Sequence, residues 1–198
     1  MIATLSPAKL SGTIPAIASK SDAHRLLILA ALCRGETRLL LEQRSADIDA
    51  TIACLCALGA TITLLPDGVL VRGIERVNEN PLLDCGESGS TFRFLLPVAA
   101  ALCEHARFTG SGRLPERPIG ELMQVLQAHG VAFSAERLPF ETAGKLTGGH
   151  FSLPGNVSSQ YLTGLLLALP LMQAQSTVSL TTRLESAAYV DITLHALK

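Results

Sequence analysis

The sequence lacks the features that mark membrane proteins, nucleic-acid-binding proteins and disulfide-stabilised domains. Its apolar runs, such as residues 165–172, are far shorter than the roughly 20 residues of a membrane span. It has no tryptophan, and its 16 Lys and Arg residues are balanced by 17 Asp and Glu residues, which argues against a surface that attracts RNA, DNA or anionic lipid. The five cysteines show no CxxC spacing, so we interpret them as buried thiols in a reducing compartment.

What is present predicts a folded domain with a sizeable core. Of the 198 residues, 48% are apolar and 17% are charged, a balance that is too apolar for a disordered protein. The start of the sequence also lacks the positive charge and apolar stretch of a secretory signal. We therefore expect a cytoplasmic protein without a membrane or nucleic-acid partner. A small anion remains a suitable ligand because it needs only a local cluster of donors.

Residues 84–96 have the composition of an anion-binding loop. They predict a short strand, a turn containing Gly86 and Gly89, and an apolar helix, an arrangement that aims unpaired backbone N–H groups at one point. Hydroxyl donors and a cation follow in the same stretch: Ser88, Ser90, Thr91 and Arg93. The alternative is an ordinary capped helix start. Arg93 could equally form an ion pair within the domain.

The order of elements around this loop occurs three times. Polar loops that open apolar helices begin near residues 18, 84 and 154. Arg25 and Arg93 hold matching places, as do the helix-ending Gly59 and Gly130, and both pairs give a repeat of about 70 residues. A third helix-ending residue would then fall beyond Lys198, so we expect a fragment of a longer protein.

The repeat predicts an α/β domain with pseudo-threefold symmetry, built from three βαβαββ units. The more apolar helix of each unit is expected in the core, and the three polar loops are expected to meet on one face, where Lys20, Arg25 and Arg117 add positive charge. Residues 138–149 are not assigned. The expected strands are 13–17, 37–41, 61–65, 69–72, 107–109, 131–135, 150–153 and 177–180, and the expected helices are 26–33, 92–102, 119–128, 162–169 and 191–197. A further helix is expected after the capping residues 45–49, with apolar residues at helical spacing up to Leu58, and it ends at Gly59.

Two further sets of side chains have structural explanations that we favour. Asp47 and Asp49 resemble an acid pair, but a helix-capping cluster beside Ser45 explains them better. The five histidines show no metal-ligand spacing on one face, so we interpret them as surface or hydrogen-bonded histidines and expect no metal. We also expect no cofactor. They are His24, His105, His129, His150 and His195.

Five motifs together resemble the N-terminal half of the 5-enolpyruvylshikimate-3-phosphate synthase family. The similarity runs from about Gly12 to the last residue, and the order of the motifs makes it specific. The motifs are Ser19-Lys20-Ser21-(x3)-Arg25, Gly86-(x)-Ser88-Gly89-Ser90-Thr91-(x)-Arg93, Glu116-Arg117-Pro118, Ser158-Ser159-Gln160-Tyr161 and Tyr189-(x)-Asp191-Ile192-Thr193.

The resemblance implies a fold and a reaction. Members have two three-repeat domains, each half of an inside-out α/β barrel, which close over shikimate 3-phosphate and phosphoenolpyruvate. They transfer the enolpyruvyl group to the 5-hydroxyl and release phosphate, and the herbicide glyphosate competes at the phosphoenolpyruvate corner. Residues 13–198 would form the N-terminal substrate-binding domain, truncated in its third repeat. Residues 1–12 would be a strand or hinge that pairs with the missing C-terminal domain.

The resemblance also implies the roles of individual residues. The residues implied for shikimate 3-phosphate are Lys20, Ser21, Arg25, Ser158, Ser159, Gln160, Ser186 and Tyr189. The residues implied for phosphoenolpyruvate are Lys20, Gly89, Ser90, Arg117 and Gln160. The proton-transferring groups belong to the C-terminal domain of the family, so no catalytic residue is expected in this chain. We expect a monomer with negligible turnover on its own.

Two positions depart from the family pattern, and three other functions are weighed. Ser90 stands where many members have threonine, and Glu87 replaces a common asparagine. We expect Glu87 to pair with a basic residue or to point away from the anion site.

A related enolpyruvyl transferase acting on a nucleotide sugar fits the first and fourth motifs poorly. An RNA 3′-phosphate cyclase has the same repeat architecture, but the near-neutral charge of this chain argues against RNA as a ligand. A non-catalytic anion-binding module is the least specific alternative.

Overall fold

The structure, a computed structural model, describes residues 4, 6–7, 9, 11–13, 19–41 and 43–198. Its elements form three successive groups, in agreement with the predicted repeat. Most of the strand expected over 13–17 and half of the pairing segment expected over 1–12 fall outside the described residues. Both therefore stay predictions.

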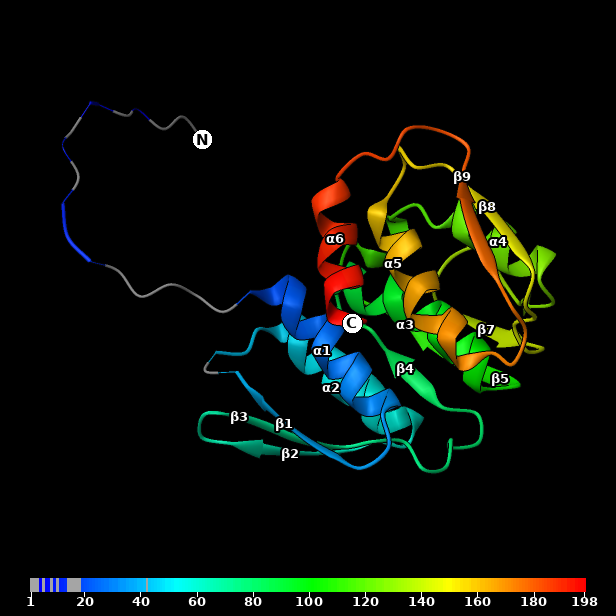
Figure 1. The fold of residues 1–198 in the computed structure, drawn as a ribbon, viewed down its shortest axis with the longest axis horizontal. Coiled ribbons are helices and arrows are strands. Elements are labelled where there is room, and N and C mark those ends of the chain that lie inside the picture. Colours follow the sequence, from blue (N-terminus) through cyan, green and yellow to red (C-terminus); the bar gives the residue numbers. More distant parts are fainter. Residues whose placement is uncertain (1–3, 5, 8, 10, 14–18, 42) are drawn as a thin grey trace.

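The first group contains two helices and a three-stranded antiparallel sheet with the order β1-β3-β2. The sheet lies under α1 and α2 (Figure 1). Its register pairs Leu40 with Gly68 at one end and Glu36 with Arg72 at the other. The elements are α1 (Lys20–Leu32), β1 (Glu36–Leu40), α2 (Ala46–Leu58), β2 (Thr61–Leu65) and β3 (Gly68–Arg72).

The second group contains a four-stranded sheet, and the third contains a two-stranded sheet. The second comprises β4 (Leu82–Asp84), α3 (Gly89–Leu102), β5 (His105–Thr109), the 3-10 turn η1 (Leu114–Glu116), α4 (Gly120–Ala128), β6 (Ala132–Phe133) and β7 (Phe140–Ala143). The third comprises β8 (His150–Leu153), α5 (Ser159–Ala168), the 3-10 turn η2 (Leu169–Leu171), β9 (Thr177–Leu180) and α6 (Ala187–Ala196).

The repeat is visible in the strand pairing. In the second group β4 runs parallel to β5, and in the third β8 runs parallel to β9. The corresponding strand of the first group would lie parallel to β1, and the described residues supply none there. Each parallel pair brackets a helix, which is the connection that two parallel strands require.

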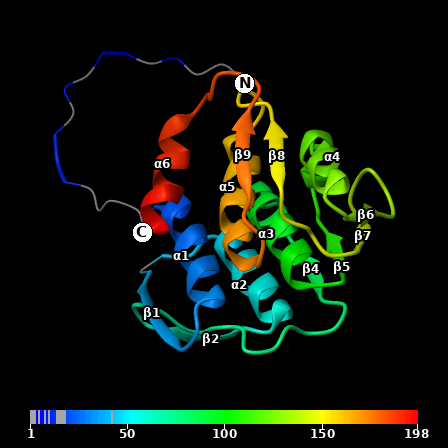
Figure 2. The same ribbon diagram turned by 45° about the vertical axis from the view of Figure 1, so that its right-hand side comes forward.

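The first helix of each group forms the core, as expected for the more apolar helices. Residues 91–100 of α3 are all buried, and α3 packs closely against α5, because Gly164 leaves the main chain of Arg93 room to approach. A methyl group at position 164 would collide with the carbonyl oxygen of Arg93. In both views α1, α3 and α5 lie together, with the sheets toward the outside (Figures 1 and 2).

Several predicted boundaries are wrong in the same direction. Helices α1, α3 and α5 begin three to six residues earlier than the apolar pattern predicts, at Lys20, Gly89 and Ser159. The polar residues that were assigned to loops form the first helical turn, because a serine before each helix caps it. Of the residues implied for substrate binding, Lys20, Ser21, Gly89, Ser90, Ser159 and Gln160 therefore lie in the first turns of helices instead of in loops.

Two other expectations were incomplete. The unassigned stretch contains β7, in which Phe140 and Thr142 are buried and alternate with more exposed residues; the expected strand at 131–135 shrinks to β6. Cys54, Cys85 and Cys103 are buried, but Cys33 is exposed at the end of α1. The prediction of buried thiols is wrong for Cys33, which lies at the exposed C-terminal end of α1, and holds only in part for Cys56, which is half-buried.

Candidate functional site

A pocket of about 630 Å³ lies where the starts of several helices meet. All eleven residues implied for substrate binding line it, although they come from five separate segments of the chain. They are Lys20, Ser21, Arg25, Gly89, Ser90, Arg117, Ser158, Ser159, Gln160, Ser186 and Tyr189. The predicted convergence of three helix starts on one face is confirmed.

The three helix starts are capped in the same way. The Ser19 hydroxyl oxygen accepts from the Asp22 N–H at 3.3 Å, that of Ser88 accepts from the Thr91 N–H at 3.1 Å, and that of Ser158 accepts from the Gln160 N–H at 3.2 Å. Each cap satisfies one backbone donor and leaves others at the helix start. Together with the helix dipoles, these remaining donors favour negative charge in the pocket.

Lys20 is an exposed cation at the side of the pocket and already has a partner. Its ammonium group lies 2.7 Å from a carboxylate oxygen of Asp47, and its side chain is 54% exposed. Asp47 lies in the first turn of α2, after the cap formed by Ser45, so the favoured capping-cluster interpretation is confirmed. It also lines the pocket, which the sequence analysis did not foresee.

Arg25 is held almost entirely by the protein itself. It is 2% exposed. Its Nε donates to Thr193 Oγ1 at 2.7 Å, and Nη2 donates to Thr163 Oγ1 at 3.2 Å and to the Tyr189 carbonyl at 2.9 Å. Nη1 donates to the Ser21 carbonyl at 2.6 Å. Arg25 therefore fastens α1 to α5 and α6, and only the second Nη1 hydrogen has no acceptor among the described residues.

Arg93 also forms hydrogen bonds within the domain, and its partner Gln160 lines the pocket. Nη1 donates to Gln160 Oε1 at 3.0 Å and Nη2 donates to the Pro118 carbonyl at 3.0 Å. Gln160 Nε2 in turn donates to Ser90 Oγ at 2.9 Å. Of the two readings of Arg93, the structure favours internal bonding, although its partners are polar groups and not a carboxylate.

Gly89 makes room for two guanidinium groups. A methyl group at this position would lie 2.7 Å from Nη1 of Arg93 and 2.8 Å from Nη1 of Arg117. The absence of a side chain therefore lets both cations approach the start of α3. This explains why a glycine stands at the point where the family resemblance implies phosphoenolpyruvate.

Ser186 and Tyr189 bring the start of α6 to the same pocket. Ser186 has a φ of 57°, a left-handed conformation that costs free energy in a residue other than glycine. Tyr189 is 49% exposed, so its ring is available to a ligand while its carbonyl holds Arg25. Strained residues of this kind concentrate at functional sites.

Glu87 also lines the pocket and has no ion-pair partner within the described part of the chain. Its carboxylate lies against the backbone of Gly112, so close that a side chain there would overlap it. Of the two alternatives expected for Glu87, pairing with a basic residue is wrong, because its carboxylate lies beside Gly112 instead. The other alternative, that it points away from a bound anion, stays a prediction. Phe94 and Val157 complete the wall and were not predicted.

His24 belongs to the core and not to the pocket wall. It is 1% exposed, its Nδ1 lies 2.7 Å from Thr51 Oγ1, and its Nε2 has no partner among the described residues. Burial lowers its pKa to about 4, against the attraction of Asp47. His129 stacks on Phe151 with 3.7 Å between the ring centres. Within the described residues, no group of three metal-ligating side chains is found.

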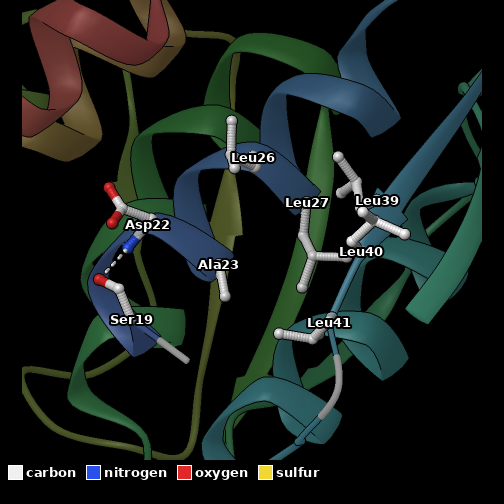
Figure 3. A pocket seen from close by; sticks show the side chains of 8 residues that line it. All are labelled: Ser19, Asp22, Ala23, Leu26, Leu27, Leu39, Leu40 and Leu41. Atoms are coloured by element: carbon white, nitrogen blue, oxygen red, sulfur yellow. Dashed lines mark hydrogen bonds between the residues drawn. The ribbon is translucent and has the colours of Figure 1, made fainter. Parts of the chain in front are cut away.

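A second hollow, of about 210 Å³, lies between α1 and β1 and is a poor anion site (Figure 3). Its labelled leucines are Leu26 and Leu27 on α1, Leu39 and Leu40 on β1, and Leu41 just after β1 (Figure 3). Its polar groups are Ser19, which caps α1, and Asp22 on the same turn. Leu40 at its edge is 76% exposed.

The described helices include none long and apolar enough to cross a membrane.

Comparison with known proteins decides the family. The family model described as EPSP synthase (3-phosphoshikimate 1-carboxyvinyltransferase) matches residues 5–198. The chain belongs to the EPSP synthase family. A 3-phosphoshikimate 1-carboxyvinyltransferase from Clostridium beijerinckii is 42% identical over 202 residues, which cover 97% of this chain and 46% of the relative. One from Clostridium kluyveri is 40% identical and is covered to the same 46%.

Solved structures show the same fold. An EPSP synthase from Acinetobacter baumannii superposes with a TM-score of 0.74 at 22% identity, over 88% of this chain and 41% of that one. The enolpyruvyl transferase NikO from Streptomyces tendae has a TM-score of 0.52 at 14% identity, over 80% of this chain and 38% of that one. The predicted α/β fold of the enolpyruvyl transferases is therefore confirmed. The chain spans about half the length of the curated relatives it matches.

Proposed function

We propose that this chain forms the shikimate 3-phosphate-binding half of an enolpyruvyl transferase. The whole protein would transfer the enolpyruvyl group of phosphoenolpyruvate to the 5-hydroxyl of shikimate 3-phosphate and release phosphate. The observation that carries the proposal is the single pocket lined by all eleven residues that the family motifs indicate. Membership of the EPSP synthase family supports the reaction.

The chemistry of the pocket suits these two substrates. Both carry phosphate and carboxylate groups, and the pocket combines Lys20, Arg117 and the Arg25 hydrogen with the hydroxyls of several serines. In this proposal Ser158 and Ser159 hold the phosphate of shikimate 3-phosphate at the start of α5, a place where backbone N–H groups favour an anion. Gly89, Ser90 and Arg117 hold phosphoenolpyruvate at the start of α3.

The reaction also needs groups that deliver and accept protons. Asp47 and Glu87 are the carboxylates in the pocket wall, and Asp47 is already paired with Lys20. We therefore assign proton transfer to the remaining part of the protein, in line with the family resemblance. The chain alone is proposed to bind substrate without turnover, as a cytoplasmic monomer that requires its partner domain for catalysis.

Isothermal titration of the chain with shikimate 3-phosphate tests this proposal. Titrations with a uridine nucleotide sugar and with a short RNA serve as controls for the other two enzymes of related architecture. We expect saturable binding of shikimate 3-phosphate only, which weakens at least tenfold in Ser159→Ala because a hydrogen bond to a charged group is lost. Binding of the nucleotide sugar alone would contradict the substrate assignment. Phosphate release by the chain at the rate of a full-length relative would contradict the proposal that proton transfer requires the remaining part of the protein.

A further inference from the structure

Arg93 is buried and hydrogen-bonded within the domain, but a contribution to folding stability does not by itself explain a cation at this position. It is 8% exposed, and burial lowers the pKa of its guanidinium group. Its Nε is buried without a hydrogen-bond partner in the described part of the molecule. A buried cation with an unpaired donor is costly, and the described residues place no carboxylate within ion-pairing distance of it. Such a cost suggests a task at the neighbouring pocket.

The surroundings hold the guanidinium group in one orientation. Nη2 donates to the Pro118 carbonyl at 3.0 Å, and the Tyr161 hydroxyl donates to the same carbonyl at 2.8 Å. The Tyr161 ring lies under the guanidinium carbon, 5.8 Å from its centre. The planar fork of arginine then aims Nη1 at Gln160.

This orientation decides which way the Gln160 amide points. An amide side chain has one oxygen that accepts and one nitrogen that donates two hydrogens, so either end could face a neutral neighbour. A guanidinium group can only donate. The 3.0 Å contact from Arg93 therefore selects Oε1 for Arg93, and Nε2 must face Ser90, where the donor–acceptor distance is 2.9 Å.

The direction of the second bond then decides what Ser90 offers. Because its Oγ accepts from Gln160, its own hydrogen is free to point elsewhere, and Ser90 and Gln160 both line the pocket. The pocket receives the Ser90 hydroxyl hydrogen and the second Nε2 hydrogen. In the reverse direction Ser90 would donate to Oε1, and lone pairs would face an incoming anion.

We propose that Arg93 is a positioning residue that fixes the direction of the Arg93–Gln160–Ser90 relay, so that both side chains in the pocket present hydrogen-bond donors to an anion. The inference rests on the proposed function of this pocket and adds the reason for its preference for acidic ligands. Gln160 and Ser90 are uncharged and could serve a neutral ligand equally well. The buried cation behind them makes them a site for phosphate or carboxylate.

The test uses the 198-residue chain with inorganic phosphate and phosphoenolpyruvate as probes. Arg93→Met keeps the length of the side chain and removes all its donors. Tyr161→Phe is the matched control, since it removes the other bond to the Pro118 carbonyl and leaves the relay intact. We expect Arg93→Met to weaken phosphoenolpyruvate binding about tenfold for each hydrogen-bond donor of Gln160 or Ser90 that no longer faces the pocket. Tyr161→Phe should change the affinity less than threefold.

Gln160→Glu gives a second, sharper test. A carboxylate at this position neutralises the buried Arg93, so the melting temperature should not fall. The same change removes the donor to Ser90 and turns acceptors toward the pocket, so binding of both probes should be lost. Loss of binding without loss of stability supports the relay. Unchanged binding in this variant overturns it.

A spectroscopic measurement keeps the inference testable without a ligand. In the wild type, the two Nε2 hydrogens of Gln160 should give separate NMR signals that exchange slowly with solvent, and in Arg93→Met they should exchange faster. If the wild type binds neither probe, the proposed phosphoenolpyruvate site is contradicted, and the Gln160 signals still decide the role of Arg93. If the wild type binds and Arg93→Met binds equally well with unchanged signals, the inference alone is overturned. If Arg93→Met does not fold, Gln160→Glu decides.

Discussion

Replacing Arg25 with methionine should destabilise the domain strongly, because this side chain joins three helices. Methionine keeps the apolar stem and removes four hydrogen bonds, to Ser21, Thr163, Thr193 and Tyr189. Bonds from a charged group contribute about 1.5–3 kcal/mol each when measured singly. Simple addition would therefore predict a loss greater than many domains can tolerate.

The structure gives two reasons for a smaller loss. The acceptors keep other partners, since Thr163 and Thr193 bond to each other at 2.9 Å and Thr193 donates to the Tyr189 carbonyl at 3.1 Å. Removing a buried cation also recovers its desolvation penalty. We expect the free energy of unfolding to fall by about 2–4 kcal/mol, a range between one charged hydrogen bond and two.

Urea denaturation followed by far-ultraviolet circular dichroism measures this loss, since the chain has no tryptophan for fluorescence. Arg38→Met is the control. It breaks an ion pair with Asp67 of 2.6 Å whose side chains are 58% and 50% exposed, and it should cost less than about 1 kcal/mol. If Arg25→Met cost no more than Arg38→Met, the reasoning would be refuted, and Arg25 would have to act mainly on the ligand.

Three further changes test other parts of the account. Gly89→Ala should weaken phosphoenolpyruvate binding about tenfold in calorimetry, as the methyl group displaces two guanidinium groups and costs at least one charged hydrogen bond; unchanged affinity would mean that they move aside freely. His24 has a pKa of about 4 in the folded chain, so below pH 6.5 it is protonated in the unfolded chain but stays neutral in the folded one. The free energy of unfolding should therefore fall by up to about 3 kcal/mol between pH 6.5 and 4. His24→Asn should flatten this pH dependence, and an equally steep curve in that variant would contradict the role of His24. Glu87→Asn should tighten phosphate binding roughly two- to fivefold by removing a nearby negative charge, and unchanged affinity would show that this charge has no influence.

The meeting of the three helix starts could be predicted from the sequence because the repeat relates these parts, whereas the full set of pocket residues was implied by the family resemblance. Residues as distant as Lys20 and Ser159 hold matching places after their cap residues, Ser19 and Ser158. Matching places in a symmetric domain meet near its axis. The family motifs then indicated which of those residues contact substrate, and the pocket contains all of them.

The internal bonds of the pocket could not be predicted in the same way. Arg25 bonds to Thr193, 168 positions away, and no periodic pattern encodes such a pair. Sequence spacing also gave no sign that Asp47 would reach Lys20, since their pairing depends on how α1 packs on α2. The helix starts were misplaced for a local reason, because apolar periodicity cannot detect a polar first turn.

Mapping shikimate 3-phosphate and phosphoenolpyruvate on the chain by NMR tests the central claim most directly. The account predicts that shikimate 3-phosphate changes backbone amide signals at the starts of α1 and α5, at residues 20–21 and 158–160, and that phosphoenolpyruvate changes those at the start of α3, at residues 89–90. The signals that respond to each ligand should saturate with a single affinity. Signals around the leucine-lined hollow between α1 and β1 should stay unchanged. Shifts confined to that hollow, or no shifts at the three helix starts at saturating ligand, would contradict the claim that the converging helix starts form the substrate site.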